Sequence, residues 1–158
     1  MKRSRLLLIA ALVPAILLGA AAPTALASGG GENLLAAGMK GPNEVLPVSA
    51  GDPDAAGYTV VRIDRGHLRV CVEDFAVGGA ELPLTLFHIH KGIAGMNGPI
   101  VVNFTPLLPS GIGCVQVPPT DRDLLKDIQR HPARYYTNVH NAPFPGGAAR
   151  GQLVTIDT

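Results

Sequence analysis

Two histidines separated by a single residue form the most informative pattern for chemistry in this sequence. Side chains alternate between the faces of a β-strand, so His88 and His90 would lie on one face, two residue rises apart. A third imidazole, His140, ends the strand expected at residues 134–140, where Asn138 shares its face. Three imidazoles on neighbouring strands would form a metal site with an open coordination position, which suits copper or zinc. We therefore take His88, His90 and His140 as candidate metal ligands, with Asn138 as a neighbour that would support them.

The same histidines also have a structural interpretation, which residue types alone favour. Their ring nitrogens would then hydrogen-bond to backbone carbonyls or to one another and organise the ends of loops. The two interpretations differ in geometry, because a metal needs one nitrogen from each ring within about 2 Å of a common point. A structural set instead needs ring nitrogens that already have protein partners. His67 and His131 belong to no comparable pattern, and we expect both to be exposed.

The N-terminal residues are typical of a cleavable secretory signal peptide. Three cations among the first five residues precede an apolar stretch at 6–22, and small residues follow at Ala25 and Ala27. The apolar stretch is shorter than the ~20 residues that span a bilayer. We therefore expect a signal peptide at 1–27, a flexible tail at 28–33 and a domain at 34–158. No second apolar stretch follows, so we expect an exported protein, secreted or in the cell envelope, with no membrane span after cleavage.

Export would change both the charge balance and the state of the cysteines. Three of the 13 basic residues lie in the expected signal peptide, which leaves ten against 12 acidic residues, a net charge of −2. This balance gives no indication of a nucleic-acid partner. Cys71 and Cys114 both follow the signal peptide, and cysteines in an oxidising compartment pair. We expect one disulfide rather than two buried thiols, with Cys71 on the polar face of its strand and the bond outside the core.

Glycine and proline are dense and evenly scattered, whereas long stretches of helical periodicity are nearly absent. This pattern favours many short strands. We expect strands at residues 34–39, 58–64, 68–77, 82–90, 100–104, 114–117, 134–140 and 149–156. The second and third of these strands would form a hairpin around Arg65 and Gly66.

One helix is expected between residues 120 and 132. Thr120 would cap it, Leu125 and Ile128 would lie on its apolar side, and Pro132 would end it. Together with the strands, this helix predicts an all-β fold, an antiparallel Greek-key β-sandwich of immunoglobulin-like or dismutase-like type.

Four ordered motifs resemble the CHRD domain, a module named for its repeats in chordin that also occurs as single exported domains in bacteria. The motifs are His-Ile-His-Lys-Gly at 88–92, Asn-Gly-Pro-Ile-Val-Val at 97–102, Tyr-Tyr-Thr-Asn-Val-His at 135–140 and Phe-Pro-Gly-Gly-Ala-Ala-Arg-Gly-Gln-Leu at 144–153. The resemblance runs from about residue 34 to the C-terminus. It implies a β-sandwich in an extracellular setting and no established catalysis.

A weaker resemblance, to copper-zinc superoxide dismutases, concerns the order of the histidines. In that family a His-Val-His strand and a later Val-His supply three copper ligands, and a C-terminal Arg guides the substrate. His88, His90 and His140 would match the ligands, and Arg150 would match the Arg. Only His131 lies between His90 and His140, so the bridging histidine and the zinc-binding loop have no counterpart. The resemblance therefore implies at most a mononuclear copper-like site.

Two classes of function follow from these patterns. The first is a noncatalytic extracellular binding or structural module that engages an extracellular or cell-surface partner. The second is a mononuclear copper or zinc site that holds the metal or carries out dismutase-like redox chemistry. Arg150 would meet an anion in the second class, or act as a buried cation that anchors the last strand to a carboxylate or loop carbonyls. The sequence contains no Gly-x-Ser-x-Gly motif and no glycine-rich phosphate loop between a strand and a helix.

Overall fold

The computed structural model describes residues 34–156, so the expected signal peptide and tail lie outside the described residues. The described strands are β1 (Leu34–Lys40), β2 (Ala56–Asp64), β3 (Arg69–Gly78), β4 (Leu86–Lys91), β5 (Ile100–Asn103), β6 (Gly113–Gln116), β7 (Tyr135–His140), β8 (Ala149–Gln152) and β9 (Val154–Thr155). The helices are α1 (Arg122–Arg130) and four 3-10 turns, η1 (Gly41–Asn43), η2 (Thr105–Leu107), η3 (Pro119–Asp121) and η4 (Pro132–Arg134). In this part of the chain no helix is long and apolar enough to cross a membrane.

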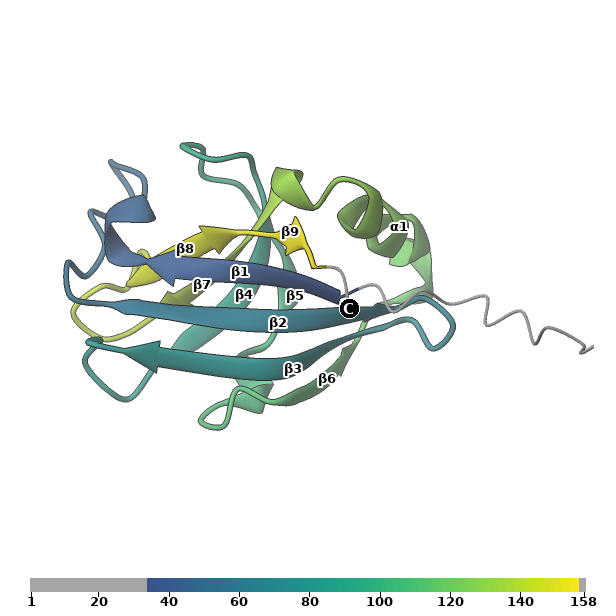
Figure 1. Ribbon diagram of the computed structural model, residues 1–158, viewed down its shortest axis with the longest axis horizontal. Coiled ribbons are helices and arrows are strands. Elements are labelled where there is room, and N and C mark those ends of the chain that lie inside the picture. Colours follow the sequence, from purple (N-terminus) through teal and green to yellow (C-terminus); the bar gives the residue numbers. More distant parts are fainter. Residues whose placement is uncertain (1–33, 157–158) are drawn as a thin grey trace, which may run out of the picture.

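The strands form one antiparallel sheet that bends back on itself. Their order is β5-β4-β7-β8-β1-β2-β3-β6, with β9 paired to β1. In Figure 1, β1, β2 and β3 lie in front of β4, β5 and β7, so the two halves of the sheet form two layers. Neighbours such as β4 and β7 are distant in the sequence, as expected of Greek-key connections. The predicted all-β antiparallel sandwich with one helix is confirmed.

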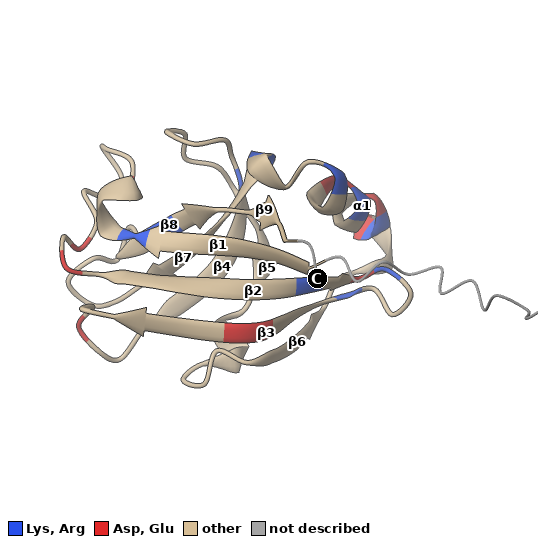
Figure 2. Cartoon of the chain, in the orientation of Figure 1, with Lys and Arg blue, Asp and Glu red and all other residues tan. Residues whose placement is uncertain are grey.

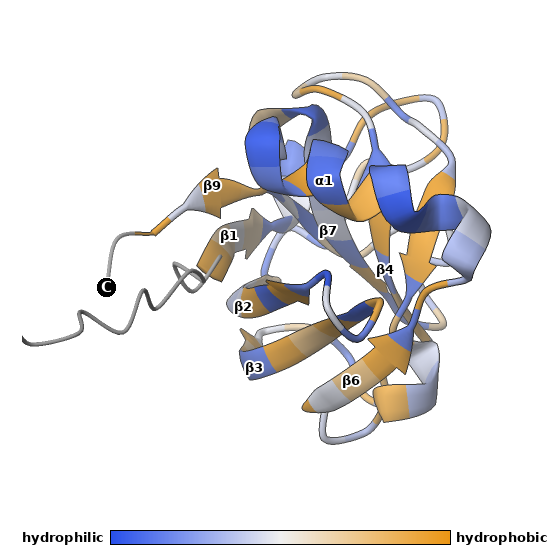
Figure 3. Cartoon of the chain, turned by 90° about the vertical axis from the view of Figure 1, so that its right-hand side faces the viewer, coloured by the Kyte–Doolittle hydropathy of each residue, from blue (hydrophilic) through white to orange (hydrophobic). Residues whose placement is uncertain are grey.

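The core lies between the two layers and is built by alternation along the strands. Val70 and Val72 on β3 and Phe87 and Ile89 on β4 all belong to one buried apolar cluster. Helix α1 covers one end of this cluster and adds Leu125 and Ile128 to it. Its remaining surface is largely hydrophilic (Figure 3) and carries charges of both signs (Figure 2).

The predicted helix cap was wrong. Asp121 stands at the N-cap position, and the Thr120 hydroxyl donates a hydrogen bond to the Asp121 carboxylate rather than to the backbone of the helix. The reason is the single turn η3, which precedes α1 and already includes Thr120.

Two predicted strands were too long. The strand expected from residue 82 begins at Leu86, because Pro83 has no N–H with which to join a ladder. The strand expected at 149–156 is divided into β8 and β9 at Leu153, whose N–H donates to the carbonyl of Tyr135 instead of to β1.

The predicted disulfide between Cys71 and Cys114 is present. The two residues lie directly opposite each other on β3 and β6, so the bond joins neighbouring strands and does not cross the core. Cys71 is nevertheless 1% exposed, which is less than an open polar face implies. The expectation of a polar face for Cys71 was wrong, because β3 is an interior strand that is buried on both faces here, with Val70 and Val72 also at most 1% exposed.

Candidate metal centre

Strands β4 and β7 bring the three candidate histidines together. His88 and His90 stand on β4, and His140 stands at the end of its antiparallel neighbour β7. Alternation along β4 turns Phe87 and Ile89 into the core, where both are fully buried. The imidazoles therefore occupy the opposite face of this strand pair.

The imidazoles are buried although they do not belong to the hydrophobic core. His88, His90 and His140 are 3%, 9% and 6% exposed, respectively. The ring centroid of His88 lies 5.5 Å from that of His90 and 5.4 Å from that of His140. One ring nitrogen from each residue lies within 4.8 Å of the other two. The structure thus assembles the three residues that the sequence singled out.

Backbone carbonyls determine the protonation of two of the rings. His90 Nδ1 lies 2.9 Å from the carbonyl oxygen of Gly98, and His140 Nδ1 lies 2.9 Å from that of Pro145. A carbonyl oxygen only accepts hydrogen bonds, so each Nδ1 carries the proton. The lone pair of each neutral ring is therefore on Nε2, and both Nε2 atoms are buried without a protein partner.

In His88 the other ring nitrogen, Nε2, makes the contact with the protein. Its Nε2 lies 3.4 Å from the hydroxyl of Thr105, whereas its Nδ1 is buried without a partner. Each of the three rings therefore has one nitrogen engaged by the protein and one nitrogen free. Histidines that bind metals show this division, because the engaged nitrogen orients the ring.

Burial keeps the cluster uncharged. Removal from water, together with repulsion from the neighbouring imidazoles His140 and His90, lowers the pKa of His88 to about 4. Burial is also the largest cause that lowers the pKa of His90 and of His140. Near neutral pH the three rings are neutral, which is the form that binds metals.

A metal ion fits this donor set after a small adjustment. Imidazole nitrogens bind zinc at about 2.0–2.1 Å, so three around one ion are about 3.5 Å apart. The separations of up to 4.8 Å close to that value when each nitrogen moves inward by less than about 1 Å. Three neutral nitrogen ligands suit copper or zinc, and they leave a coordination position open.

Asn138 lies beside the cluster but is turned toward a carboxylate. It stands directly opposite His88 on the neighbouring strand. Its Nδ2 donates to Glu44 Oε2 at 3.5 Å, whereas its Oδ1 and Glu44 Oε1 are buried without partners. Burial raises the pKa of Glu44 to about 7, although the charge of Arg150 and the Asn138 hydrogen bond act to lower it.

The guanidinium of Arg150 is engaged by the loop before β5. Arg150 is 1% exposed, and its nitrogens donate to Asn97 Oδ1 at 3.3 Å, to the Met96 carbonyl at 3.1 Å and to Gln152 Oε1 at 3.4 Å. Its Cζ also lies 3.4 Å from the ring centroid of Tyr136. These contacts match the anchoring role that the sequence offered as one alternative.

Two residues beside the histidines, Tyr136 and Glu44, were not predicted from the sequence. Tyr136 stacks on His90, with ring centroids 4.8 Å apart and planes 5° from parallel. The signal was available, because Tyr136 precedes Asn138 by two residues and so shares its face. Glu44 follows η1 and lies 94 residues from Asn138, and no pattern in the sequence connects the two.

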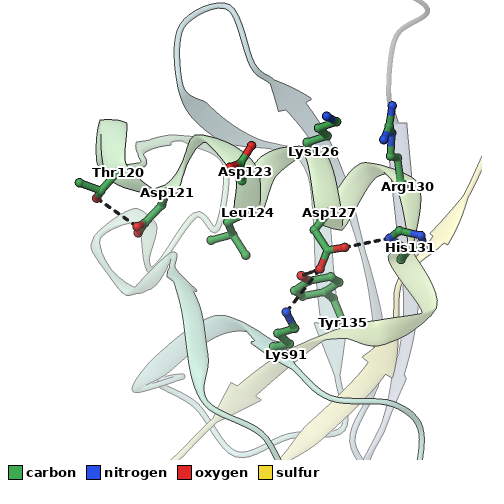
Figure 4. Close-up of a pocket in the computed structure, with 10 residues that line it drawn as sticks. All are labelled: Lys91, Thr120, Asp121, Asp123, Leu124, Lys126, Asp127, Arg130, His131 and Tyr135. Carbon is green, nitrogen blue, oxygen red and sulfur yellow. Dashed lines mark hydrogen bonds and ion pairs between the residues drawn. The ribbon is translucent and has the colours of Figure 1, made fainter.

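A second polar cluster surrounds Asp127 on α1 (Figure 4). His131 Nδ1 lies 2.8 Å from Asp127 Oδ1, Lys91 Nζ lies 3.4 Å from Asp127 Oδ2, and the Tyr135 hydroxyl donates to Oδ2. The Tyr135 and His131 hydrogen bonds lower the pKa of Asp127 to about 2. His131 is exposed as expected, but the Asp127 partner one helical turn away was missed. A surface hollow of about 560 Å³ lies over this cluster, away from the three buried histidines.

In a comparison with known families, the model of the CHRD domain matches residues 35–153. No curated protein and no solved structure matches the chain.

Proposed function

Because the chain belongs to the CHRD domain family, whose members are extracellular-type binding modules, we propose that it is an exported module that binds one copper or zinc ion through His88, His90 and His140. The match covers residues 35–153 and therefore includes all three histidines.

The three buried nitrogens without protein partners carry this proposal. An unsatisfied buried polar atom costs about 1–3 kcal/mol. His88 Nδ1, His90 Nε2 and His140 Nε2 are three such atoms in one cluster. A cation bound to all three would use the Nε2 lone pairs of His90 and His140. It would also use the Nδ1 lone pair of His88, with the His88 Nε2 proton donated to the Thr105 hydroxyl.

Copper is the stronger of the two candidates by affinity. Divalent copper exceeds zinc in the Irving–Williams order for a given set of nitrogen ligands. When bound, either metal supplies a Lewis acid with an open coordination position. The role of the chain is to hold the ion and exclude water, since the three rings are at most 9% exposed.

The contacts of Arg150 support metal holding over dismutase-like chemistry. Three of the five donors of this guanidinium are already used in hydrogen bonds within the protein. The guanidinium of Arg150 contacts Asn97, Met96, Gln152 and the ring of Tyr136.

Export is part of the same proposal. The disulfide between Cys71 and Cys114 supports an oxidising compartment, as does the extracellular setting of CHRD domains. The signal-like residues 1–27 supply the means of export.

Metal analysis tests the proposal. The protein is purified without an affinity tag, incubated with Cu²⁺ or Zn²⁺, freed of excess metal and measured by mass spectrometry of the elements. We expect one ion per chain, and a loss of affinity of at least about 100-fold in His140→Ala. His131→Ala is the matched control, because it removes an exposed imidazole from the other polar cluster. Retention of neither metal by the wild-type protein would exclude the proposed site.

A further inference from the structure

The buried position of the histidines raises the question of how a cation reaches them. A hollow of about 460 Å³ lies beside the cluster, and its lining includes Glu44, Arg150, Asn43, Ala94 and Gln152. None of the three imidazoles lines it. A cation in this hollow is therefore still separated from the proposed ligands.

The sheet register shows how short this separation is. Arg150 stands opposite Asn138 in the pairing of β7 with β8, and Asn138 stands opposite His88 in the pairing of β4 with β7. The wall of the hollow is thus two strand spacings from a proposed ligand, at about 4.8 Å each. Asn138 stands on the intervening strand β7, and its side chain contacts Glu44.

Two oxygen atoms without donors lie along this line. Glu44 Oε1 and Asn138 Oδ1 are both buried, and neither has a hydrogen-bond partner. The Glu44 carboxylate packs on Gly147, where an added Cβ would lie 2.6 Å from it. The absence of a side chain at Gly147 therefore leaves room for the carboxylate in this position.

The charges around Glu44 suit a temporary cation ligand. Arg150 on β8 is the charged group that acts on it, whereas Asn138 on β7 and Gly147 are uncharged. The positive charge of Arg150 opposes a cation beside Glu44 and also acts on His90, so the ligand atoms and not this charge set the direction of transfer. Imidazole nitrogens bind copper more strongly than a carboxylate oxygen does, so transfer toward the histidines is favourable.

We propose that Glu44 is the capture ligand of this metal centre, which takes a cation from the hollow and passes it to His88, His90 and His140. The inference rests on the proposed metal site and adds its route of loading. Glu44 acts on the rate of exchange and is not a ligand of the resting site.

Stopped-flow loading of the full chain with Cu²⁺, supplied as its glycine complex, tests this role. The chain has three tyrosines and no tryptophan, and Tyr136 stacks on His90, so bound Cu²⁺ is expected to quench tyrosine fluorescence. We expect Glu44→Gln to slow association and dissociation alike by about tenfold, with a dissociation constant within about threefold of wild type. Glu73→Gln is the matched control, because it removes the same charge from the exposed pair with Arg62.

The pH profile supplies a second readout. Because the pKa of Glu44 is about 7, the wild-type association rate should rise from about pH 6 to about pH 8 more steeply than that of Glu44→Gln. Equal rates and equal profiles in the two proteins would overturn the capture role while leaving the metal site intact. A loss of equilibrium affinity as large as the loss of rate would also overturn it, because Glu44 would then be a resident ligand. If the wild-type protein binds no Cu²⁺, the proposed function and the capture role both fail.

Discussion

The two polar clusters differ in how completely their groups are paired. Around Asp127, the imidazole of His131, the ammonium of Lys91 and the hydroxyl of Tyr135 all meet one carboxylate at the surface. Among His88, His90 and His140, one nitrogen of every ring has no partner, and all three rings are buried.

This difference in pairing, and not the volume of a hollow, indicates which cluster can bind a ligand. The surface hollow at Asp127 is large, but the carboxylate beneath it is already paired with Lys91, His131 and Tyr135 (Figure 4). The histidine cluster needs no large hollow, because a single ion fits among three nitrogens. Unpaired donors and acceptors indicate a ligand more directly than open volume does.

The largest expected effect that distinguishes the clusters is stabilisation by metal. Cu²⁺ or Zn²⁺ at about 100 times its dissociation constant should raise the free energy of unfolding by about 3 kcal/mol. His88→Ala should abolish this gain, and His131→Ala should retain it. Thermal unfolding with and without metal measures the effect. If metal stabilises the His88→Ala protein as much as the wild type, the histidine cluster is not the metal site.

The buried histidines should also make the free energy of unfolding of the metal-free protein fall as the pH is lowered. The pKa of His88 falls from 6.5 to about 4 on folding, so below pH 6.5 the unfolded chain binds more protons and stability declines. Glu44 acts in the opposite direction, because its pKa rises from 4.5 to about 7 and its ionisation costs stability over that range. In Glu44→Gln, where this opposing contribution is absent, we expect a loss of about 2 kcal/mol between about pH 6.5 and about pH 5. Urea unfolding at both pH values measures it, and a flat profile would contradict the inference that the rings are buried and neutral.

The smallest expected effect concerns Asp127. Asp127→Asn should lower the free energy of unfolding near neutral pH by about 1 kcal/mol, since it weakens hydrogen bonds at a partly exposed site. Because folding lowers the pKa of Asp127 from 3.8 to about 2, its contribution is present above about pH 4 and is lost as the pH falls toward about 2. The free energy of unfolding of the variant should lack this decline at acid pH, and its metal affinity should equal that of the wild type. A change in metal affinity would show that the two clusters are coupled.

Much of the fold was predictable from local patterns. Alternation around His88 and His90 identified β4, and the one-sided stripe of Leu125 and Ile128 identified α1. The errors fell at boundaries, at Pro83 and at Leu153, where the choice of hydrogen-bond partner decided the end of a strand.

The candidate site was predictable in its ligands and not in their surroundings. The spacing of His88 and His90 predicts a shared face, and His140 joins them through the pairing of β4 with β7. The carbonyl partners Gly98 and Pro145 come from loops whose conformations leave no signal in residue types.

The sequence by itself determined which side chains share a face, because the alternation of a strand is a local property of the backbone. It also determined the disulfide partners, since Cys71 and Cys114 are the only cysteines. The tertiary structure alone decided that the imidazoles are buried, which nitrogen of each remains free, and that Glu44 lies beside Asn138. These properties depend on loops that fold over the sheet from distant parts of the chain, and only packing brings them together.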